Sequence, residues 1–175
     1  MRIREATADD APDIASVHVR SWQVAYRGLL PDEVLDGLSA QGRTELWSRI
    51  LETDRPGDAV LVVDGEAGTE GFAHVCTSRD GDRGEHTGEI SSLYLVPEAW
   101  GSGRGRALME AAEARLAAEG YREATLWVLV ANARARRFYA AAGWECDGTQ
   151  RTEAIAGGRA LVTETHYRRV LRTRT

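Results

Sequence analysis

The sequence contains no lysine, since all 22 of its basic residues are arginines, and Asn132 is its only asparagine. A Walker A phosphate loop needs a lysine after its glycine, so the missing lysine excludes that class of nucleotide site. Cys76 and Cys146 are the only cysteines, which is too few for a disulfide framework. We therefore expect both thiols to be reduced.

Long hydrophobic runs are also missing. The longest uncharged run, residues 124–133, is shorter than the roughly 18 apolar residues that a membrane helix needs. The first residues, Met1 to Glu5, lack the apolar stretch of a secretory signal, so we expect a cytoplasmic protein with no membrane partner. The net charge of −5 argues against a nucleic-acid partner, because phosphate binding needs a clustered basic face.

What the sequence does have is the length and apolar content of a globular domain: 175 residues, of which 43% are hydrophobic. It contains no internal repeat, no low-complexity tract and no break in composition. We therefore predict a single domain over residues 1–175.

The residue pattern predicts elements in the order α-α-β-β-β-α-β-α-β-β, and it leaves open an additional N-terminal strand. Apolar residues at helical spacing predict a first helix from Ile14 to Tyr26. A second helix is expected to begin at Pro31 and to continue to Leu51. The next expected elements are a hairpin of 59–63 and 71–76, a mobile loop at 77–87, a strand at 89–96, a helix ending at Gly120, a strand at 124–130, a helix at 133–142, and strands at 144–149 and 161–170.

A strand, a glycine-spaced turn and a helix follow one another in the middle of the chain, and the turn is Gly101-Ser102-Gly103-Arg104-Gly105. Such a turn points backbone N–H groups outward at the positive end of a helix, which suits a pyrophosphate. A Rossmann fingerprint is excluded, because Arg106 and Leu108 stand where that motif needs small residues. By itself, the turn is equally compatible with a helix start that binds nothing.

Two blocks carry a more specific pattern. Residues 93–108 (LYLVPEAWGSGRGRAL) match Q/R-x-x-G-x-G/A except that Trp100 holds the first position. Residues 132–144 match N-x-x-A-x-x-F-Y-x-x-x-G-F except that Trp144 ends the block. With these blocks the chain resembles the GNAT superfamily of acetyl-CoA-dependent N-acetyltransferases, and the expected order of elements extends the resemblance over nearly the whole chain.

The resemblance implies an α/β (α+β) fold with a mixed, mainly antiparallel central sheet flanked by helices, and acetyl-CoA as co-substrate. It implies that the backbone at Leu93, Tyr94 and Leu95 binds the pantetheine arm and that Asn132 contacts the same arm. The turn would hold the pyrophosphate through Trp100, Gly101, Ser102, Gly103, Arg104 and Gly105. Since this turn works mainly through backbone N–H groups, we expect Trp100 in place of arginine or glutamine to weaken pyrophosphate binding only slightly.

Tyr139 and Glu89 are the catalytic residues that the resemblance implies. Transfer of an acetyl group to an amine needs a proton for the leaving thiolate, which a tyrosine hydroxyl at Tyr139 can donate. Glu89 matches a glutamate that acts as a base through water, and strand alternation would place it on one face with Ser91, Leu93 and Leu95 unless a bulge intervenes. The alternatives are that Tyr139 only packs its helix, that Glu89 is a solvated carboxylate, and that water is the base.

On the acceptor side, the family's acetyltransferases of ribosomal-protein amino termini have a glutamate base at the position of Trp127, which cannot take a proton. Trp22, Tyr26 and Trp47, together with Asp32, Glu33, Asp36 and Glu45, are candidates for a pocket that binds a cationic amine. The alternative is that the aromatic residues are core and the acids are a solvated face.

The leading prediction is therefore direct acetyl transfer from acetyl-CoA to the primary amine of a small molecule. The alternatives are a protein lysine or N-terminal acetyltransferase and a non-catalytic acyl-CoA-binding sensor. The histidines, His18, His74, His86 and His166, are dispersed and lack metal-ligand spacing, so no metal is expected. Self-association is common in the family, and a homodimer stays open because no segment identifies an interface.

Overall fold

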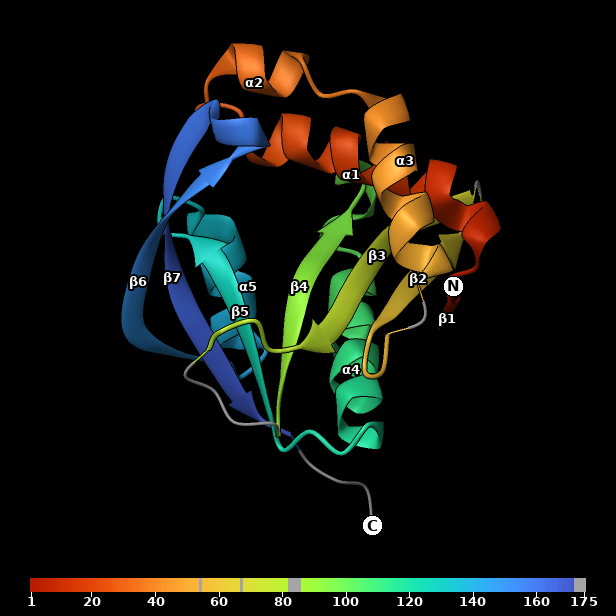
Figure 1. The fold of residues 1–175 in the computed structure, drawn as a ribbon, viewed down its shortest axis with the longest axis vertical. Helices are drawn as coiled ribbons and strands as arrows, with labels where there is room; N and C mark the ends of the chain where they lie inside the picture. The colour runs from red at the N-terminus through yellow and green to blue at the C-terminus, as the bar shows by residue number, and fades with distance from the viewer. Residues whose placement is uncertain (54, 67, 82–85, 172–175) are drawn as a thin grey trace.

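The computed structural model describes residues 1–53, 55–66, 68–81 and 86–171, which form a seven-stranded sheet with helices on both faces (Figure 1). The strands are β1 (Arg2–Glu5), β2 (Ala59–Gly65), β3 (Gly68–Thr77), β4 (Thr87–Leu95), β5 (Glu123–Leu129), β6 (Glu145–Ile155) and β7 (Ala160–Val170). The helices are α1 (Ala11–Ala25), α2 (Asp32–Asp36), α3 (Ala40–Glu52), α4 (Arg104–Ala118) and α5 (Ala133–Ala141), with short 3-10 turns η1 (Ala8–Asp10), η2 (Pro97–Ala99) and η3 (Ala156–Gly158).

The strand order is β1-β2-β3-β4-β5-β7-β6, and every neighbouring pair is antiparallel except β4 and β5. The predicted mixed, mainly antiparallel α/β fold is thus confirmed, and β1 is the N-terminal strand that the sequence left open. The predicted hairpin is the pair β2 and β3. Parallel pairing of β4 with β5 requires a crossover, and the chain makes it through α4.

Two corrections concern element boundaries. The second predicted helix is in fact two helices: α2 ends at Gly37, and Ser39 begins α3 by accepting a hydrogen bond from the Gly42 N–H (3.1 Å). The predicted strand at 144–149 extends to Ile155 as β6. The predicted loop at 77–87 begins and ends within strands, and its residues 82–85 lie outside the described residues.

The main core lies on both sides of β2, β3 and β4, where α1 and α3 cover one face and α4 covers the other (Figure 1). Phe72, Ile14 and Leu108 are among its fully buried side chains. A smaller apolar cluster joins α2 to β7, with Leu35 packed among Val34 and Val162. This second cluster fixes α2 above the end of the sheet, where the sheet opens.

Candidate active site

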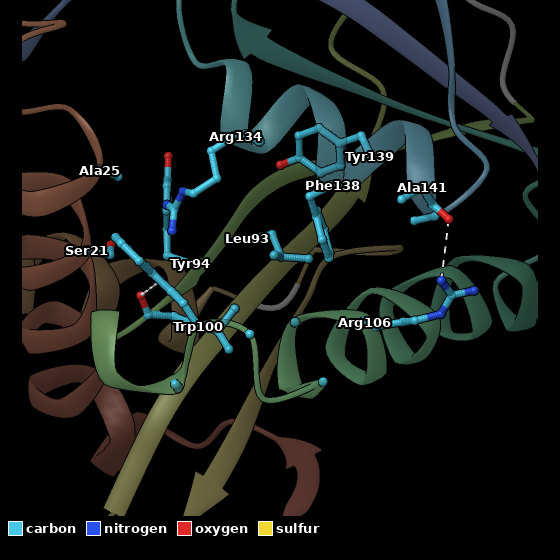
Figure 2. A pocket seen from close by; sticks show the side chains of 17 residues that line it. Ser21, Ala25, Leu93, Tyr94, Trp100, Arg106, Arg134, Phe138, Tyr139 and Ala141 are labelled. Atoms are coloured by element: carbon cyan, nitrogen blue, oxygen red, sulfur yellow. Dashed lines mark hydrogen bonds between the residues drawn. The ribbon is translucent and has the colours of Figure 1, made fainter.

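The sheet opens between β4 and β5. These strands pair over Thr87–Glu89 and Glu123–Thr125, and among the described residues they form no further ladder beyond that stretch. A cavity of about 370 Å³, called the first cavity here, lies at the open end between β4, the start of α4 and α5 (Figure 2). Its lining comes from α1 at Ser21 and Ala25, from residues 93–95 of β4, from parts of the turn at 99–106, and from α5.

A second cavity, of about 270 Å³, continues from the first toward α1 and the β6–β7 hairpin. Leu93, Tyr94, Arg134 and Tyr139 line both cavities, so the two cavities adjoin and Tyr139 is part of both linings. A reactant in the first cavity and a reactant in the second would meet beside that tyrosine.

A β-bulge interrupts β4 between the two predicted site regions. His74 on β3 is opposite Ser92, whereas the next residue, Val75, is opposite Ile90, so Ser91 is the extra residue. A bulge changes the side-chain alternation along its strand. The predicted common face of Glu89, Ser91 and Leu93, which required an unbulged strand, is therefore not the arrangement found.

The turn before α4 leaves its backbone open, as the sequence predicted. Gly101 and Gly103 have φ angles of 73° and 84°, and a Cβ atom at either position would meet no heavy atom within 4 Å. The first N–H groups of α4 have no partner within the helix and lie at the positive end of its dipole. The turn thus has both the space and the donors to hold an anionic group.

Two predicted residues of this turn point their side chains elsewhere. The Ser102 hydroxyl donates to the Ala99 carbonyl oxygen (2.5 Å), and the Arg104 guanidinium pairs with the Glu70 carboxylate on β3 (2.5 Å). Neither residue is part of the first cavity's lining. In this arrangement, Ser102 and Arg104 have only their backbone groups to offer to a ligand.

Arg134 stacks on Trp100, and both side chains line the first cavity (Figure 2). The Trp100 indole N–H donates to the Leu95 carbonyl oxygen (3.0 Å), and the Arg134 guanidinium carbon lies 3.4 Å from the centre of the indole ring. Burial lowers the pKa of Arg134. Sequence analysis assigned no role to Arg134, although its place two residues after Asn132 was a signal, because it puts a cation at the start of α5.

Tyr139 projects from α5 with its hydroxyl toward Arg134 and Tyr94 (Figure 2). Its ring also packs against Phe138 and Tyr167, with ring centres 5.4 and 5.9 Å away. Burial raises the pKa of Tyr139, and the neighbouring Tyr94 raises it further, so the hydroxyl keeps its proton at neutral pH. The packing role and the position of a proton donor are therefore compatible in one residue.

Asn132 caps α5. Its side-chain oxygen accepts a hydrogen bond from the Ala135 N–H (3.1 Å), and the residue is buried while it lines the second cavity. An N-cap satisfies a helix N–H group that would otherwise lack a partner. The only asparagine thus holds the helix that carries Tyr139 and Arg134.

Glu89 lines the second cavity but is bound to Arg79. Its Oε2 accepts from the backbone N–H (3.0 Å) and from Nε (3.2 Å) of Arg79, and its Oε1 accepts from the guanidinium (2.5 Å). Burial alone would raise the pKa of Glu89, but the hydrogen bonds and charge of Arg79 outweigh burial and lower the pKa. Its carboxylate is therefore ionised, with both of its oxygens engaged.

The acidic residues predicted for the acceptor pocket lie on the surface, and the structure does not bring them to a cavity. Asp32 and Asp36 both pair with Arg27 (2.9 and 2.8 Å) and are more than 60% exposed. Glu33 and Glu45 are also exposed. Trp22 and Tyr26 do line the second cavity, whereas Trp47 is buried in the core and donates its indole N–H to His18 (3.1 Å).

Trp127 also lines the second cavity, and its indole N–H donates to the Asp80 carboxylate (3.1 Å).

Among the described residues, no group of His, Cys, Asp and Glu side chains is arranged to hold a metal ion. Within the same residues, no helix is both long enough and apolar enough to cross a membrane.

Solved structures with the same fold come from N-acetyltransferases. The PaiA N-acetyltransferase of Thermoplasma acidophilum, solved with coenzyme A, has a TM-score of 0.78 at 19% identity and covers 97% of this chain and 98% of its own. YncA of Salmonella typhimurium, a putative acetyltransferase solved with acetyl-CoA, has a TM-score of 0.72 at 20% identity and covers 100% and 96%. The opened sheet and the turn before α4 thus define the N-acetyltransferase fold class.

Sequence comparison gives the family. The profile of the acetyltransferase (GNAT) family matches residues 20–144. The uncharacterized N-acetyltransferase YuaI of Bacillus subtilis (strain 168) is 33% identical over 132 residues, 74% of this chain and 72% of its own. An uncharacterized N-acetyltransferase of Archaeoglobus fulgidus is 37% identical over 142 residues, 80% and 90% of the two chains. The chain belongs to the acetyltransferase (GNAT) family and is an acyl-CoA-dependent N-acetyltransferase.

Proposed function

We propose that the enzyme transfers the acetyl group of acetyl-CoA directly to the primary amine of a small molecule. The observation that carries this proposal is the meeting of the two cavities at Tyr139. A volume of about 270 Å³ in the second cavity suits a small acceptor. Every carboxylate in that cavity's described lining is paired with an arginine: Glu89 with Arg79, and Glu164 with Arg151 (2.9 Å). That pairing leaves no free carboxylate to attract a strongly cationic acceptor such as a polyamine.

The residues around the first cavity fit acetyl-CoA. The open backbone at Gly101 and Gly103 suits the pyrophosphate, and the exposed edge of β4 at residues 93–95 suits an extended arm that adds to the sheet. Asn132 affects the binding of the arm indirectly, because it caps α5 and so positions the start of that helix. When bound, acetyl-CoA supplies an activated acetyl group as a thioester.

Tyr139 is proposed as the proton donor to the leaving sulfur. A donor must hold a proton at working pH and lie within hydrogen-bond reach of the group that receives it. The raised pKa of Tyr139 meets the first condition, and its place where the cavities meet supports the second. Glu89 stays a candidate for the base, but its ion pair with Arg79 makes its carboxylate a weak proton acceptor.

A thiol-release screen tests the proposal. Acetyl-CoA is incubated with the enzyme and with amino acids, polyamines, aminoglycosides or peptides, and free thiol is followed with a chromogenic disulfide. We expect release with a small amine and no mass shift on any peptide. Acetylated peptides would favour a protein acetyltransferase. Tight binding of acetyl-CoA by calorimetry without turnover of any amine would favour a sensor.

A further inference from the structure

His74 on β3 and Ser91 on β4 form a hydrogen-bonded pair that the proposed chemistry has not yet used. The Ser91 hydroxyl oxygen lies 2.7 Å from His74 Nδ1 and 3.3 Å from the His74 carbonyl oxygen. Because Ser91 is the extra residue of the bulge, it has no residue opposite it on β3. The bulge thus turns a serine of β4 onto a histidine of the neighbouring strand.

Ser91 stands between the second cavity and a third cavity of about 360 Å³, because it lines both. His74 and Asp58 line the third cavity but not the second. The serine hydroxyl therefore separates the proposed acceptor site from the imidazole.

The two carboxylates and the histidine in the lining of the second cavity are poor candidates for the base. Glu89 and Glu164 are ion-paired with arginines, as described above. His18 accepts the indole N–H of Trp47 at its Nδ1 atom (3.1 Å), and burial together with the charge of Arg43 lowers the pKa of His18 to about 3. A group with such a low pKa is a poor base at neutral pH. Burial lowers the pKa of His74 too, but the carboxylates of Asp58 and Glu89 oppose that shift, and His74 Nδ1 faces the Ser91 hydroxyl.

The groups around His74 favour a neutral imidazole that can accept a proton at Nδ1. Burial lowers the pKa of His74, so the ring is neutral at neutral pH. The Asp58 carboxylate, 3.9 Å from Nε2, and Glu89 act in the opposite direction, while Arg79 and Arg55 reinforce burial. The nearby Asp58 favours the ring proton on Nε2, which leaves Nδ1 as the acceptor of the Ser91 hydroxyl proton. Burial raises the pKa of the neighbouring Cys76 thiol to about 12, so the thiol adds no charge.

We propose that Ser91 and His74 form a proton relay that deprotonates the acceptor amine. The relay rests on the proposed function. An N–H bond of the ammonium breaks and its proton forms an O–H bond with Ser91, while the original Ser91 proton passes to His74 Nδ1. The products are a neutral amine, an intact serine hydroxyl and an imidazolium, which Asp58 stabilises. The imidazolium later gives its proton to water in the third cavity.

The test compares His74→Gln and Ser91→Ala with two controls. Ser91→Thr keeps the hydroxyl, and His86→Gln removes an exposed histidine that lines none of the three cavities. The readout is kcat/KM for thiol release between about pH 5.5 and 9, a range from roughly one unit below to two and a half units above the ordinary histidine pKa. Two nucleophiles are used: the panel amine that reacts fastest, and hydroxylamine, which is already neutral at pH 7.

We expect His74→Gln and Ser91→Ala to lower kcat/KM for the amine by about 100-fold at pH 7, since general bases contribute at least that much. Hydroxylamine needs no deprotonation, so its rate should change little. His86→Gln should behave as the unmodified enzyme, and Ser91→Thr, which keeps the hydroxyl, should retain more of the amine rate than Ser91→Ala. Asp58→Asn should move the acidic limb of the amine profile to lower pH, because that carboxylate raises the pKa of His74.

Two results would overturn the relay while leaving the proposed function intact. One is a His74→Gln enzyme that keeps both the kcat/KM for the amine at pH 7 and the acidic limb of its pH profile. The other is an equal loss with the amine and with hydroxylamine, which indicates structural damage instead of a lost base. An unmodified enzyme that binds acetyl-CoA but acetylates neither nucleophile would contradict the proposed function itself.

Discussion

The first and second cavities are built in different ways. The first includes a backbone site, made by the edge of β4 at residues 93–95 and the turn with Gly101 and Gly103, beside side chains from the start of α5. The second is formed by side chains from segments far apart in the sequence, such as Trp22 on α1, Glu89 on β4 and Glu164 on β7. A backbone site needs only a few residues at fixed spacing, whereas a side-chain site depends on the whole fold. Under the proposed function, the binding of the common donor is therefore local, and the recognition of the particular acceptor is distributed.

Tyr139 belongs to both cavities, so its substitution tests whether they act as one site. We expect Tyr139→Phe to lower kcat by about 1000-fold, because it removes a proposed general acid, while acetyl-CoA affinity by calorimetry stays close to that of the unmodified enzyme. Tyr121→Phe is the matched control, since its hydroxyl bonds to Thr77 (2.5 Å) and lines none of the three cavities. Full activity of Tyr139→Phe across the pH range would remove the tyrosine from the mechanism.

Gly103→Val tests the backbone site. A valine side chain would occupy the open space above the turn, and we expect acetyl-CoA affinity to fall by about 100-fold, or roughly 2.7 kcal/mol. Gly120→Val is the control, because Gly120 has a similar φ angle (91°) and open surroundings at the opposite end of α4. Both variants should lose similar thermal stability, but Gly103→Val alone should lose affinity. An equal affinity for the two variants would place the pyrophosphate elsewhere.

Glu89→Gln tests whether the ion pair of Glu89 in the second cavity stabilises the folded protein. The pKa of Glu89 is lowered in the folded protein, so its ion pair adds stability above the ordinary carboxyl pKa. That contribution is lost as the pH falls through the lowered pKa. We expect Glu89→Gln to reduce the free energy of unfolding by about 2 kcal/mol at pH 7 and by less at pH 3, as measured with urea. A loss that does not depend on pH would contradict the ion-pair account.

Asn132→Ala tests the role of the residue that caps α5. We expect a loss of about 1 kcal/mol in the free energy of unfolding from the missing cap, together with weaker acetyl-CoA binding. Asn132→Ser keeps a capping oxygen but lacks the amide. If Asn132→Ser is stable yet binds acetyl-CoA weakly, the amide contacts the arm directly. If it behaves as the unmodified enzyme in both measurements, the cap is the whole role of Asn132.

Asp36→Asn has the smallest expected effect. Asp36 pairs with Arg27 on the surface, where such pairs contribute about 0–1 kcal/mol. We expect an unchanged KM for the acceptor and a change in unfolding free energy of less than about 0.5 kcal/mol. A clear rise in KM would restore the predicted acidic pocket and would break the distinction between the two cavities.

The sequence predicted the fold and the turn before α4 correctly, because periodicity and glycine spacing are local properties. It was wrong on the single helix from Pro31 to Leu51, which α2 and α3 replace, and of its two interpretations of the acids, a solvated face is the one that agrees with their exposure. It did not find Arg134 or the pair of His74 and Ser91. That pair joins two strands and depends on a bulge, for which the sequence carries no marker.

The sequence by itself determined the family and predicted the donor-binding elements. Two short motifs are enough for this, since a turn, a strand edge and a helix start need only neighbouring residues. The tertiary structure decided which charges are neutralised, which side chains line the second cavity and where Ser91 points. Each of these depends on contacts between residues such as Arg79 and Glu89, or His74 and Ser91, which only the folded sheet brings together.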